Sequence, residues 1–438
     1  MKSVVCSAVN NMKDSGIKWL GMIPKHWDVV LVKNILRWKS VKGCGEKEVL
    51  SLYREYGVIP KSSRDDNHNV TSDNTDDYKL VEKGDFVINK MKAWQGSMGV
   101  SLYEGIISPA YYVCSFINEK VYKPYFHYLM RDSSYLPEYK RLSGGIRVGQ
   151  WDLAYDKFKS LPALLPPTLS EQRAIADWID AKCADIDAAI ELQQRMIDKL
   201  KAYKTAVIHQ AVTKGLDKNT NLKDSGVQWI GEVPQHWEVC KLSYCFNQIG
   251  SGTTPKYSEE VRGEEGIAWI QSGDLNDGVL KSTKHLLPKE VVSQYSVLKI
   301  YKQPFIGVAM YGASIGKTSL SLIDACTNQA CCVLADSKGD LQYSFYVMLS
   351  LKSLLIYLGI GGGQPNISQA IIKQQCIPLP PLTEQRAIAN WLDAKCADID
   401  ATIALKEQKQ EKLKAYKKTI IFEYVTGKKQ VANINKQL

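Results

Sequence analysis

EQRAIADWIDAKCADIDAAI occupies residues 171–190, and EQRAIANWLDAKCADIDATI occupies residues 384–403. The two stretches differ at three of twenty positions, so the chain carries one segment twice at an offset of 213 residues. A second pair, KDSGIKWLGMIPKHWDVV from Lys13 and KDSGVQWIGEVPQHWEVC from Lys223, precedes them. Internal self-similarity indicates duplicated structural units. The two halves therefore lie near residues 1–220 and 221–438.

Each copy of the first repeat has the pattern of a long helix. Two prolines stand just upstream, in LPPTLS and LPPLT, where they block helix formation. We expect Ser170 or Thr383 to supply the N-cap hydroxyl, and in the first copy Thr168 and Glu171 have capping-box spacing. About 44 residues at roughly 1.5 Å each predict a helix about 65 Å long.

Apolar residues recur at threes and fours along both predicted helices, which marks one buried face. They are Ile179, Cys183, Ile186, Ile190, Ile197, Leu200 and Val207 in the first copy, and Leu392, Cys396, Ile399, Ile403, Leu413 and Ile420 in the second, where Gln410 replaces Ile197. Because one helix cannot bury such a stripe alone, we expect the two helices to pack as an antiparallel coiled coil. Two independent helices, each capping its own domain, are the alternative.

The segments outside the helices contain short β-type runs, turns and glycines. GDFVINKM (84–91) and QPFIGVAM (303–310) are each followed by a loop, two strand-like runs and a helix-like run in the same order. This order predicts an α+β chain with two domains of one fold and different loops. The expected boundaries are a first domain at 1–165, a helix at 166–215, a second domain at 216–378, a helix at 379–428 and a polar tail at 429–438.

The composition favours a polyanionic partner. Lys and Arg exceed Asp and Glu by 56 to 46, a formal charge of +10, which suits nucleic acid. The first residues lack the apolar core of a signal peptide, and no apolar window is long enough for a bilayer, so a cytoplasmic location is expected. Eleven cysteines without a Cys-x-x-Cys motif predict neither a disulfide framework nor a zinc site. Cys183 and Cys396 read as small core residues.

Motifs that could carry catalysis are weak. GASIGKTS (312–319) has one residue too few for a phosphate-binding loop, and the aligned KAWQGSMG has no Gly-Lys-Thr. His26 and His236 recur in Pro-x-His-Trp, which favours structural packing, and the paired aspartates of CADID read as solvated. We expect no catalytic residue and no metal ligand.

With these features the chain resembles the specificity (S) subunit of Type I DNA restriction–modification systems. The resemblance spans nearly the whole chain. Its most specific carriers are LPPTLSEQRAIADWIDAK with LPPLTEQRAIANWLDAK, SGIKWLGMIPKHW with SGVQWIGEVPQHW, and in the second half SGTTPKYS (251–258), WIQSGDL (269–275), GASIGK, TNQA and GGGQPNIS. The resemblance implies two target-recognition domains held apart by the helices, with a pseudo-two-fold internal repeat.

The resemblance also implies partners. Each domain would read one half of a split double-stranded DNA site, and two adenine-N6 methyltransferase (M) subunits and two restriction/translocase (R) subunits would dock. SAM, ATP and Mg would belong to those partners, so no cofactor is expected here. Because the domains differ, the site should be non-palindromic. A helix of about 65 Å spans roughly 19 base pairs, so half-site separation should follow helix length.

Loop position and side-chain type suggest which residues contact DNA. The candidates are Lys90, Lys92, Trp94, Gln95, Arg147 and Gln150 in the first domain, and Thr253, Thr254, Lys256, Tyr311, Ser314, Lys317, Gln364 and Asn366 in the second. Arg173, Trp178, Arg386 and Trp391 are the candidates for docking M subunits. Packing between the helices is an equal alternative for the two tryptophans.

Other functions remain open at this point. A coiled-coil scaffold without DNA specificity, or a DNA-binding protein of an unrelated system, would share the helices and the basic charge. A fused methyltransferase or nuclease would need an Asn-Pro-Pro-Tyr-like tetrapeptide or a clustered Asp, Glu and Lys metal site, and the sequence contains neither.

Overall fold

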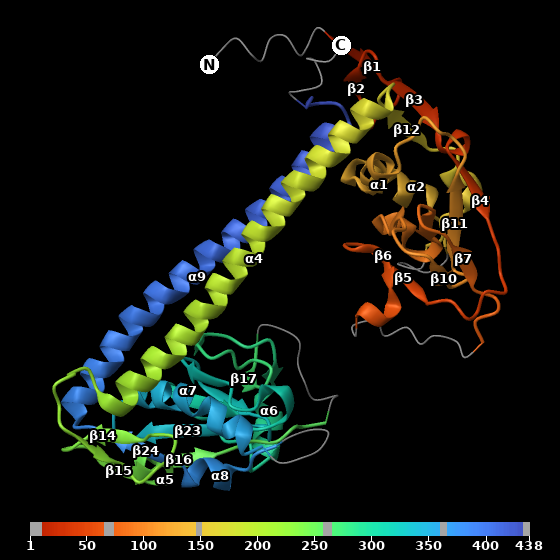
Figure 1. Cartoon of the computed structure of the whole chain (residues 1–438). Helices are drawn as coiled ribbons and strands as arrows, with labels where there is room; N and C mark the ends of the chain where they lie inside the picture. The colour runs from red at the N-terminus through yellow and green to blue at the C-terminus, as the bar shows by residue number, and fades with distance from the viewer. Residues whose placement is uncertain (1–10, 65–73, 146–150, 257–264, 360–365, 432–438) are drawn as a thin grey trace. The chain divides into compact units, whose positions relative to one another are not determined.

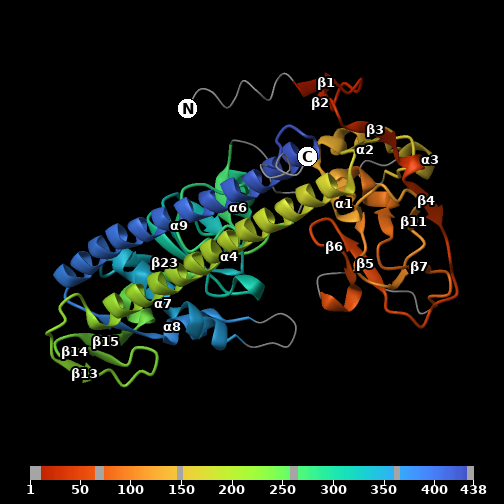
Figure 2. The ribbon, with the colours of Figure 1, turned by 45° about the horizontal axis from the view of Figure 1, so that its top comes forward.

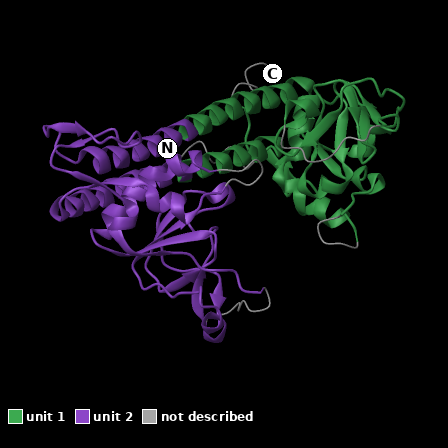
Figure 3. Ribbon diagram, turned by 90° about the horizontal axis from the view of Figure 1, so that it is seen from below, with its two compact units in different colours: residues 1–193, 408–438 green, residues 194–407 purple. Residues whose placement is uncertain are grey.

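The computed structural model describes residues 11–64, 74–145, 151–256, 265–359 and 366–431. The chain forms two compact units, residues 1–193 with 408–438 and residues 194–407 (Figure 3). Both boundaries fall inside two long helices, α4 (Leu169–Lys214) and α9 (Leu382–Val425) (Figure 1). Each unit therefore contains the start of one long helix and the end of the other. We call the part of unit 1 that precedes α4 domain 1, and the part of unit 2 between α4 and α9 domain 2.

Domain 1 is built on a four-stranded antiparallel sheet in the order β4 (Leu36–Lys39), β11 (Tyr111–Phe116), β8 (Phe86–Asn89), β9 (Met98–Val100). Antiparallel pairs surround it: β1 (Met12–Asp14) with β2 (Met22–Pro24), β3 (Asp28–Leu31) with β12 (Pro162–Leu165), β5 (Leu50–Tyr53) with β6 (Gly57–Pro60), and β7 (Lys79–Val81) with β10 (Gly105–Ile107). The helices are α1 (Lys123–Arg131), α2 (Leu136–Leu142) and α3 (Tyr155–Phe158), with 3-10 turns η2 (Val32–Asn34), η3 (Lys61–Ser63), η4 (Lys90–Gln95) and η5 (Ser133–Tyr135).

Domain 2 repeats that central order and adds one strand. Its sheet runs β16 (Phe246–Gly250), β23 (Cys331–Ser337), β20 (Phe305–Ala309), β21 (Thr318–Ser321), β18 (Val279–Leu280). β13 (Leu222–Asp224) pairs with β14 (Glu232–Pro234), β15 (Glu238–Lys241) with β24 (Cys376–Leu379), and β17 (Ile267–Ile270) with β19 (Leu286–Leu287) and β22 (Ala325–Thr327). The helices are α5 (Leu242–Cys245), α6 (Lys289–Gln294), α7 (Leu341–Tyr357) and α8 (Gln369–Gln374), with the 3-10 turn η7 (Gly312–Ser314). The predicted α+β class with two domains of similar fold is confirmed.

The strands beside the central sheet pair in the same way in both domains. In domain 1, β10 pairs with β7 in antiparallel orientation, and Ile106 of β10 makes an isolated parallel bridge to Val49. In domain 2 the corresponding strand, β22, pairs with β17 in parallel orientation, and Ala325 of β22 makes an isolated antiparallel bridge to Tyr301. The common fold that the order of strand-like runs predicted therefore extends beyond the central sheet.

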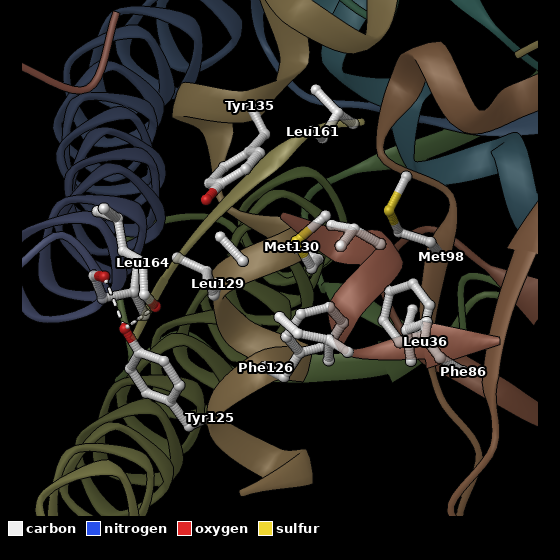
Figure 4. Close-up of a cluster of buried hydrophobic side chains, with 14 of the residues drawn as sticks. Leu36, Phe86, Met98, Tyr125, Phe126, Leu129, Met130, Tyr135, Leu161 and Leu164 are labelled. Atoms are coloured by element: carbon white, nitrogen blue, oxygen red, sulfur yellow. Dashed lines mark hydrogen bonds between the residues drawn. The ribbon is translucent and has the colours of Figure 1, made fainter. Parts of the chain in front are cut away.

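The core of domain 1 closes around helix α1. Tyr125, Phe126, Leu129 and Met130 lie at i, i+1, i+4 and i+5, and all four are buried, which is the spacing of an apolar helix face. Phe126 packs edge-on against Phe86 of the sheet (Figure 4). The Tyr125 hydroxyl lies 3.0 Å from the Leu164 carbonyl and 3.1 Å from the Val425 carbonyl. The last turn of α9 is therefore part of the domain 1 core.

Helix α4 begins one residue earlier than its predicted cap. Because Leu169 is already helical, Ser170 lies inside the first turn. Thr168 is the capping residue: its hydroxyl accepts a hydrogen bond from the Glu171 amide at 3.2 Å. In α9 the Pro381 carbonyl accepts from the amide of Glu384 instead. The prediction of Ser170 and Thr383 as N-caps was wrong, because both helices extend back to the residue before them.

The carboxylate of Glu171 contacts domain 1 and does not form a reciprocal capping box. It accepts hydrogen bonds from the Trp27 indole at 2.9 Å and contacts the His26 ring at 3.1 Å. Glu384 makes the same pair of contacts with Trp237 at 3.0 Å and His236 at 2.7 Å. The predicted structural role of the two Pro-x-His-Trp motifs is thereby explained: each ties its domain to the first turn of the helix that follows it.

The two long helices run antiparallel, as predicted. In unit 1 the Lys417 ammonium lies 2.6 Å from the Asp187 carboxylate, and in unit 2 Lys204 lies 2.6 Å from Asp400. Residue numbers therefore rise along α4 as they fall along α9, and Figures 1 and 2 both show the helices side by side. The predicted apolar stripe is the contact face, where Ile197 packs with Ile399 and Ile403. The alternative of two independent helices is excluded.

Candidate nucleic-acid interface

A 3-10 turn after strand β8 presents four of the predicted DNA-binding residues, Lys90, Lys92, Trp94 and Gln95. The Asn89 side chain caps this turn by accepting from the amides of Met91 and Lys92 at 3.1 and 3.2 Å. Gly96 ends the turn with φ of 81°, a conformation that favours glycine. The sequence thus fixes the turn at both ends, with the Lys92 side chain exposed and the other three side chains partly exposed.

Three aromatic residues from distant parts of the sequence meet beside this turn. Trp38 of β4, Tyr112 of β11 and Tyr155 of α3 form a cluster that we call the aromatic platform, with ring centroids 5.5 to 5.6 Å apart. The Trp38 side chain is 46% exposed. The Lys90 ammonium lies 4.7 Å from the centre of the Tyr112 ring, within cation–π range. Sequence reasoning missed the platform, because its members are adjacent only through strand pairing.

Lys79 is a buried cation next to the platform. Its side chain is 5% exposed, its ammonium donates to the carbonyls of Pro109 at 3.0 Å and Tyr111 at 2.6 Å, and it lies 5.8 Å from the centre of the Trp38 ring. Burial, together with the positive charges of Lys90 and Lys42, lowers the pKa of Lys79 to about 8. The two carbonyl contacts and the low exposure show that Lys79 is held inside the domain.

A hollow of about 730 Å³ in unit 1 borders the same turn. Trp94, Gln95, Arg54, Arg131, Lys140 and Lys418 are among its lining residues. Trp94 packs edge-on against Trp151 at 5.2 Å, and the Lys140 ammonium lies 5.6 Å from the centre of the Trp151 ring. Cations and aromatic rings thus lie beside the turn, the combination that nucleic-acid surfaces use.

The predicted residues of domain 2 come together through polar bridges. The Thr254 hydroxyl donates to Gln329 at 2.6 Å, and Gln369 donates to the Ser251 hydroxyl at 2.6 Å. Tyr311 pairs with Asn366 in an isolated antiparallel bridge. These contacts link four segments: the segment of Ser251, Thr253, Thr254 and Lys256, the segment of Tyr311, Ser314 and Lys317, the segment of Gln329, and the segment that begins at Asn366.

Sequence reasoning placed Gln329 in a motif without giving it a role. Its contact with Thr254 shows that it belongs to this surface. The segment 312–319 passes from η7 into strand β21, whereas a phosphate-binding loop leads into a helix. Three predicted DNA contacts, Arg147, Gln150 and Gln364, lie outside the described residues.

The predicted docking residues on the long helices differ between the two copies. Trp178 stacks on Tyr424 with ring centroids 3.8 Å apart, and the Arg173 guanidinium lies 5.2 Å from the centre of the Tyr122 ring. Trp391 is 42% exposed and lines a hollow of about 450 Å³ with Tyr203 and Ala211. Arg386 is exposed.

The described part of the structure contains neither a metal-binding cluster nor a membrane-spanning helix. Within it, no three His, Cys, Asp or Glu side chains are grouped so as to hold a metal ion. The same part of the chain contains no helix with the length and apolarity needed to cross a bilayer.

Residues 24–202 and 234–415 match the family model described as the Type I restriction modification DNA specificity domain. The chain is 28% identical over 435 residues to the Type I restriction enzyme MjaVIII specificity subunit of Methanocaldococcus jannaschii, covering 94% of this chain and 95% of that one. It is 36% identical over 261 residues to the Type I restriction enzyme EcoBI specificity subunit of Escherichia coli, covering 54% and 52%.

Two solved structures share the fold. One, from work described as "Structural basis underlying complex assembly and conformational transition of the type I R-M system", has a TM-score of 0.70 at 14% identity and covers 92% of this chain and 98% of that one. The crystal structure of the HsdS subunit from Thermoanaerobacter tengcongensis has a TM-score of 0.50 at 15% identity, with the same coverage.

Proposed function

Because this chain belongs to the Type I restriction–modification DNA specificity family and serves in sequence-specific DNA recognition, we propose that each domain reads one half of a bipartite, non-palindromic double-stranded site. The observation that carries the proposal is the contrast between the halves. One sheet order and one helix are duplicated, while the loops on the domains have different side chains. A symmetric reader would match a palindrome, and two unlike readers match two unlike half-sites.

In domain 1 we propose that Lys90 and Lys92 bind phosphates, with Trp94 and Gln95 facing base edges. The aromatic platform extends this surface, because Trp38 offers an exposed ring and the neighbouring Tyr112 ring lies within cation–π range of Lys90. Arg147 and Gln150 remain proposals from the sequence.

In domain 2 we propose a surface richer in hydroxyl and amide groups. Thr253, Thr254, Tyr311, Ser314 and Asn366 offer donors and acceptors for base edges. Lys256 and Lys317 supply phosphate contacts, and Gln364 is retained from the sequence. The contacts of Gln329 and Gln369 and the bridge between Tyr311 and Asn366 support the proposal, because they link the segments that carry these residues.

Membership of this family implies DNA, M subunits and R subunits as partners in general. We propose two M and two R subunits, with one M docking on each long helix near Arg173 and Trp178 or near Arg386 and Trp391. Two copies of one partner need two similar surfaces, and the helix repeat provides them, although Tyr424 covers Trp178 and no such ring stands at the corresponding position beside Trp391. SAM, ATP and Mg would be bound by the partners, and the chain itself would be non-catalytic and cytoplasmic. We propose five functional segments: a first target-recognition domain at 1–165, a first long helix at 166–215, a second target-recognition domain at 216–378, a second long helix at 379–428 and a polar C-terminal tail at 429–438.

The docking proposal has a direct test. Arg173→Ala combined with Arg386→Ala should reduce co-purification of M subunits. Arg195→Ala, which lies on α4 with Arg173, serves as the control. Undiminished recovery of M with the double variant would refute a docking role for the arginines.

The DNA proposal is tested with the chain, its M partners and SAM on duplex DNA. We expect labelling that requires both the chain and M, and a genome-wide N6-methyladenine map should lose one bipartite motif when the gene is deleted. Labelling without M would indicate an enzyme, and no labelling with both would favour a scaffold.

Trp38→Ala should weaken DNA binding about tenfold, and Trp38→Phe should retain most of it.

A further inference from the structure

Two cysteine side chains of domain 2 lie close enough to react with each other. Cys240 is the third residue of the four-residue strand β15, and Cys245 is the last residue of α5, a single helical turn. Their sulfur atoms are 3.1 Å apart. A disulfide needs about 2.05 Å, so a shift of roughly 1 Å closes the bond. Because one turn separates them in the chain, the shift does not require the sheet to move.

A hollow gives small molecules access to this pair. It has a volume of about 550 Å³ and is lined by both cysteines together with Glu238, Tyr244 and Lys338. Cys245 is 6% exposed, while Cys240 is partly exposed. Solvent therefore reaches Cys240 first, and Cys245 lies directly behind it.

The internal repeat shows that the fold does not need these thiols. In PKHWDVVLVKNI and PQHWEVCKLSYC, Val30 occupies the place of Cys240 and Ile35 the place of Cys245. Ile35 is fully buried in the domain 1 core, as Cys245 is buried in the domain 2 core. Apolar side chains thus fill the same positions, and the packing requirement alone does not explain two sulfurs.

We propose that Cys240 and Cys245 are a modification site, a thiol pair that a peroxide converts into an intrachain disulfide. Cys240 attacks the peroxide, Cys245 resolves the product, and the pair can be restored by a dithiol. The site lies three residues after Trp237, which anchors domain 2 to the start of α9 through Glu384.

The surroundings assign the two roles. The hydrogen bond between the two sulfur atoms lowers the pKa of Cys240, against the effect of burial and of the Glu238 carboxylate. The same hydrogen bond and burial raise the pKa of Cys245, while Lys338 opposes this. Thiolate is the reactive form, and Cys240 is also the more exposed of the two sulfurs, so Cys240 is the attacking sulfur.

The reaction balances with hydrogen peroxide as the oxidant. The Cys240 thiolate bonds to one peroxide oxygen, the O–O bond breaks, and the departing hydroxide takes up a proton to become water. The Cys245 sulfur then attacks the Cys240 sulfenic acid, its proton joins the leaving hydroxide, and a second water departs. Two thiols lose two electrons and two protons in total, and one peroxide is reduced to two waters.

Peptide mapping of the full chain tests this reaction. Trypsin cuts after Lys223, Lys241 and Lys256, so Cys240 falls in 224–241 and Cys245 in 242–256, each with one cysteine. After mild peroxide treatment and blocking of free thiols, non-reducing mass spectrometry should find these two peptides joined, two hydrogens lighter than their sum. A dithiol should separate them.

Variants taken from domain 1 supply the controls. Cys240→Val and Cys245→Ile should each abolish the joined peptides, and their unfolding temperatures should stay near that of the parent chain. Cys245→Ile should leave Cys240 to accumulate as sulfenic acid, detectable with a dimedone probe. Joining of Cys240 to Cys376, which lies opposite Lys241 in β24, would overturn the assignment, as would oxidation of Cys240 without joining.

Discussion

The two places where a domain meets the ends of the long helices can be compared atom by atom. Tyr125 in unit 1 contacts the carbonyls of Leu164 and Val425, and Tyr343 in unit 2 contacts those of Pro378 and Val212. Tyr128 pairs with Asp180, and Tyr346 pairs with Asp393 at 2.6 Å. The internal contacts that hold each domain to both helices are thus duplicated almost without change.

The outer faces of the same helices are not duplicated. Trp178 is covered by Tyr424 in unit 1. The residue that corresponds to Tyr424 in unit 2 is Ala211, so Trp391 has no such ring over it and borders a hollow. The contacts that hold each domain to the long helices are therefore constrained by packing, while the outer faces of the helices are free to differ. If M subunits dock here, the two docking surfaces are not equivalent.

Domain exchange should give the largest effect. Replacing residues 222–378 with the corresponding domain of another family member should change one half of the methylated motif and leave the other half intact, because the frame contacts are separate in the two units. Long-read mapping of N6-methyladenine would show the change. A motif altered in both halves would break the comparison.

The two tryptophans should differ in their effect on stability. Trp178→Ala removes a stacked pair and should lower the free energy of unfolding by about 2 to 3 kcal/mol. Trp391→Ala should lower it by less than about 1 kcal/mol, because that ring is substantially exposed. Denaturant unfolding of the full chain measures both. Equal losses would show that the exposed ring contributes as much as the stacked one.

The hydroxyl groups of Tyr125 and Tyr343 should contribute equally to stability. Tyr125→Phe and Tyr343→Phe each remove a buried hydroxyl shared by two carbonyls, at a cost of about 1 to 2 kcal/mol each. Phe keeps the ring, so packing is preserved. Similar shifts in the unfolding midpoint are expected, and a loss confined to one variant would contradict the equivalence of the two frames.

Lys79 should give domain 1 a pH dependence of its own. Its pKa in the folded state is about 8, below the value of about 10.4 in an unfolded chain. Between these values the unfolded chain binds more protons, so the contribution of Lys79 to stability rises with pH. The stability of the parent chain relative to Lys79→Met should therefore increase from pH 8 to pH 10. A relative decrease over that range would show that the charged form is favoured by folding.

The ion pairs between the helices should give the smallest effect. Asp187→Asn and Asp400→Asn each remove one exposed pair, with Lys417 or Lys204, and should cost about 0.5 kcal/mol. The two losses should match and shrink in high salt. A loss several times larger in either unit would show that the pair is shielded from solvent.

Local patterns in the sequence predicted much of this frame. The stripe through Ile179, Ile197 and Ile403 determined two helices that pack antiparallel, because burial of one apolar face has few solutions. The order of strand-like runs predicted the common sheet. The Pro-x-His-Trp motifs indicated packing, although their partner, Glu171 or Glu384, could be assigned only from the structure.

Features that depend on distant contacts escaped prediction. Trp38, Tyr112 and Tyr155 form one platform because β4 pairs with β11 and α3 packs beside them, and no local spacing signals that meeting. The N-cap was misplaced by two residues in α4, since Ser170 and Thr168 are both good capping residues. The structure links the loop candidates Thr254, Tyr311 and Asn366 to neighbouring segments through Gln329 and Gln369, which were not identified beforehand. The contact of these candidates with DNA stays a prediction.

The contact between Tyr125 and the Val425 carbonyl joins residues 300 positions apart. A ribosome releases Tyr125 long before it has made Val425, so the first domain must wait, with one side of its core unfinished, until α9 has been synthesised. The second domain has no such delay, since Val212 is made before Tyr343. During synthesis the later half can therefore complete its core first, and the earlier half depends on it to deliver the closing segment.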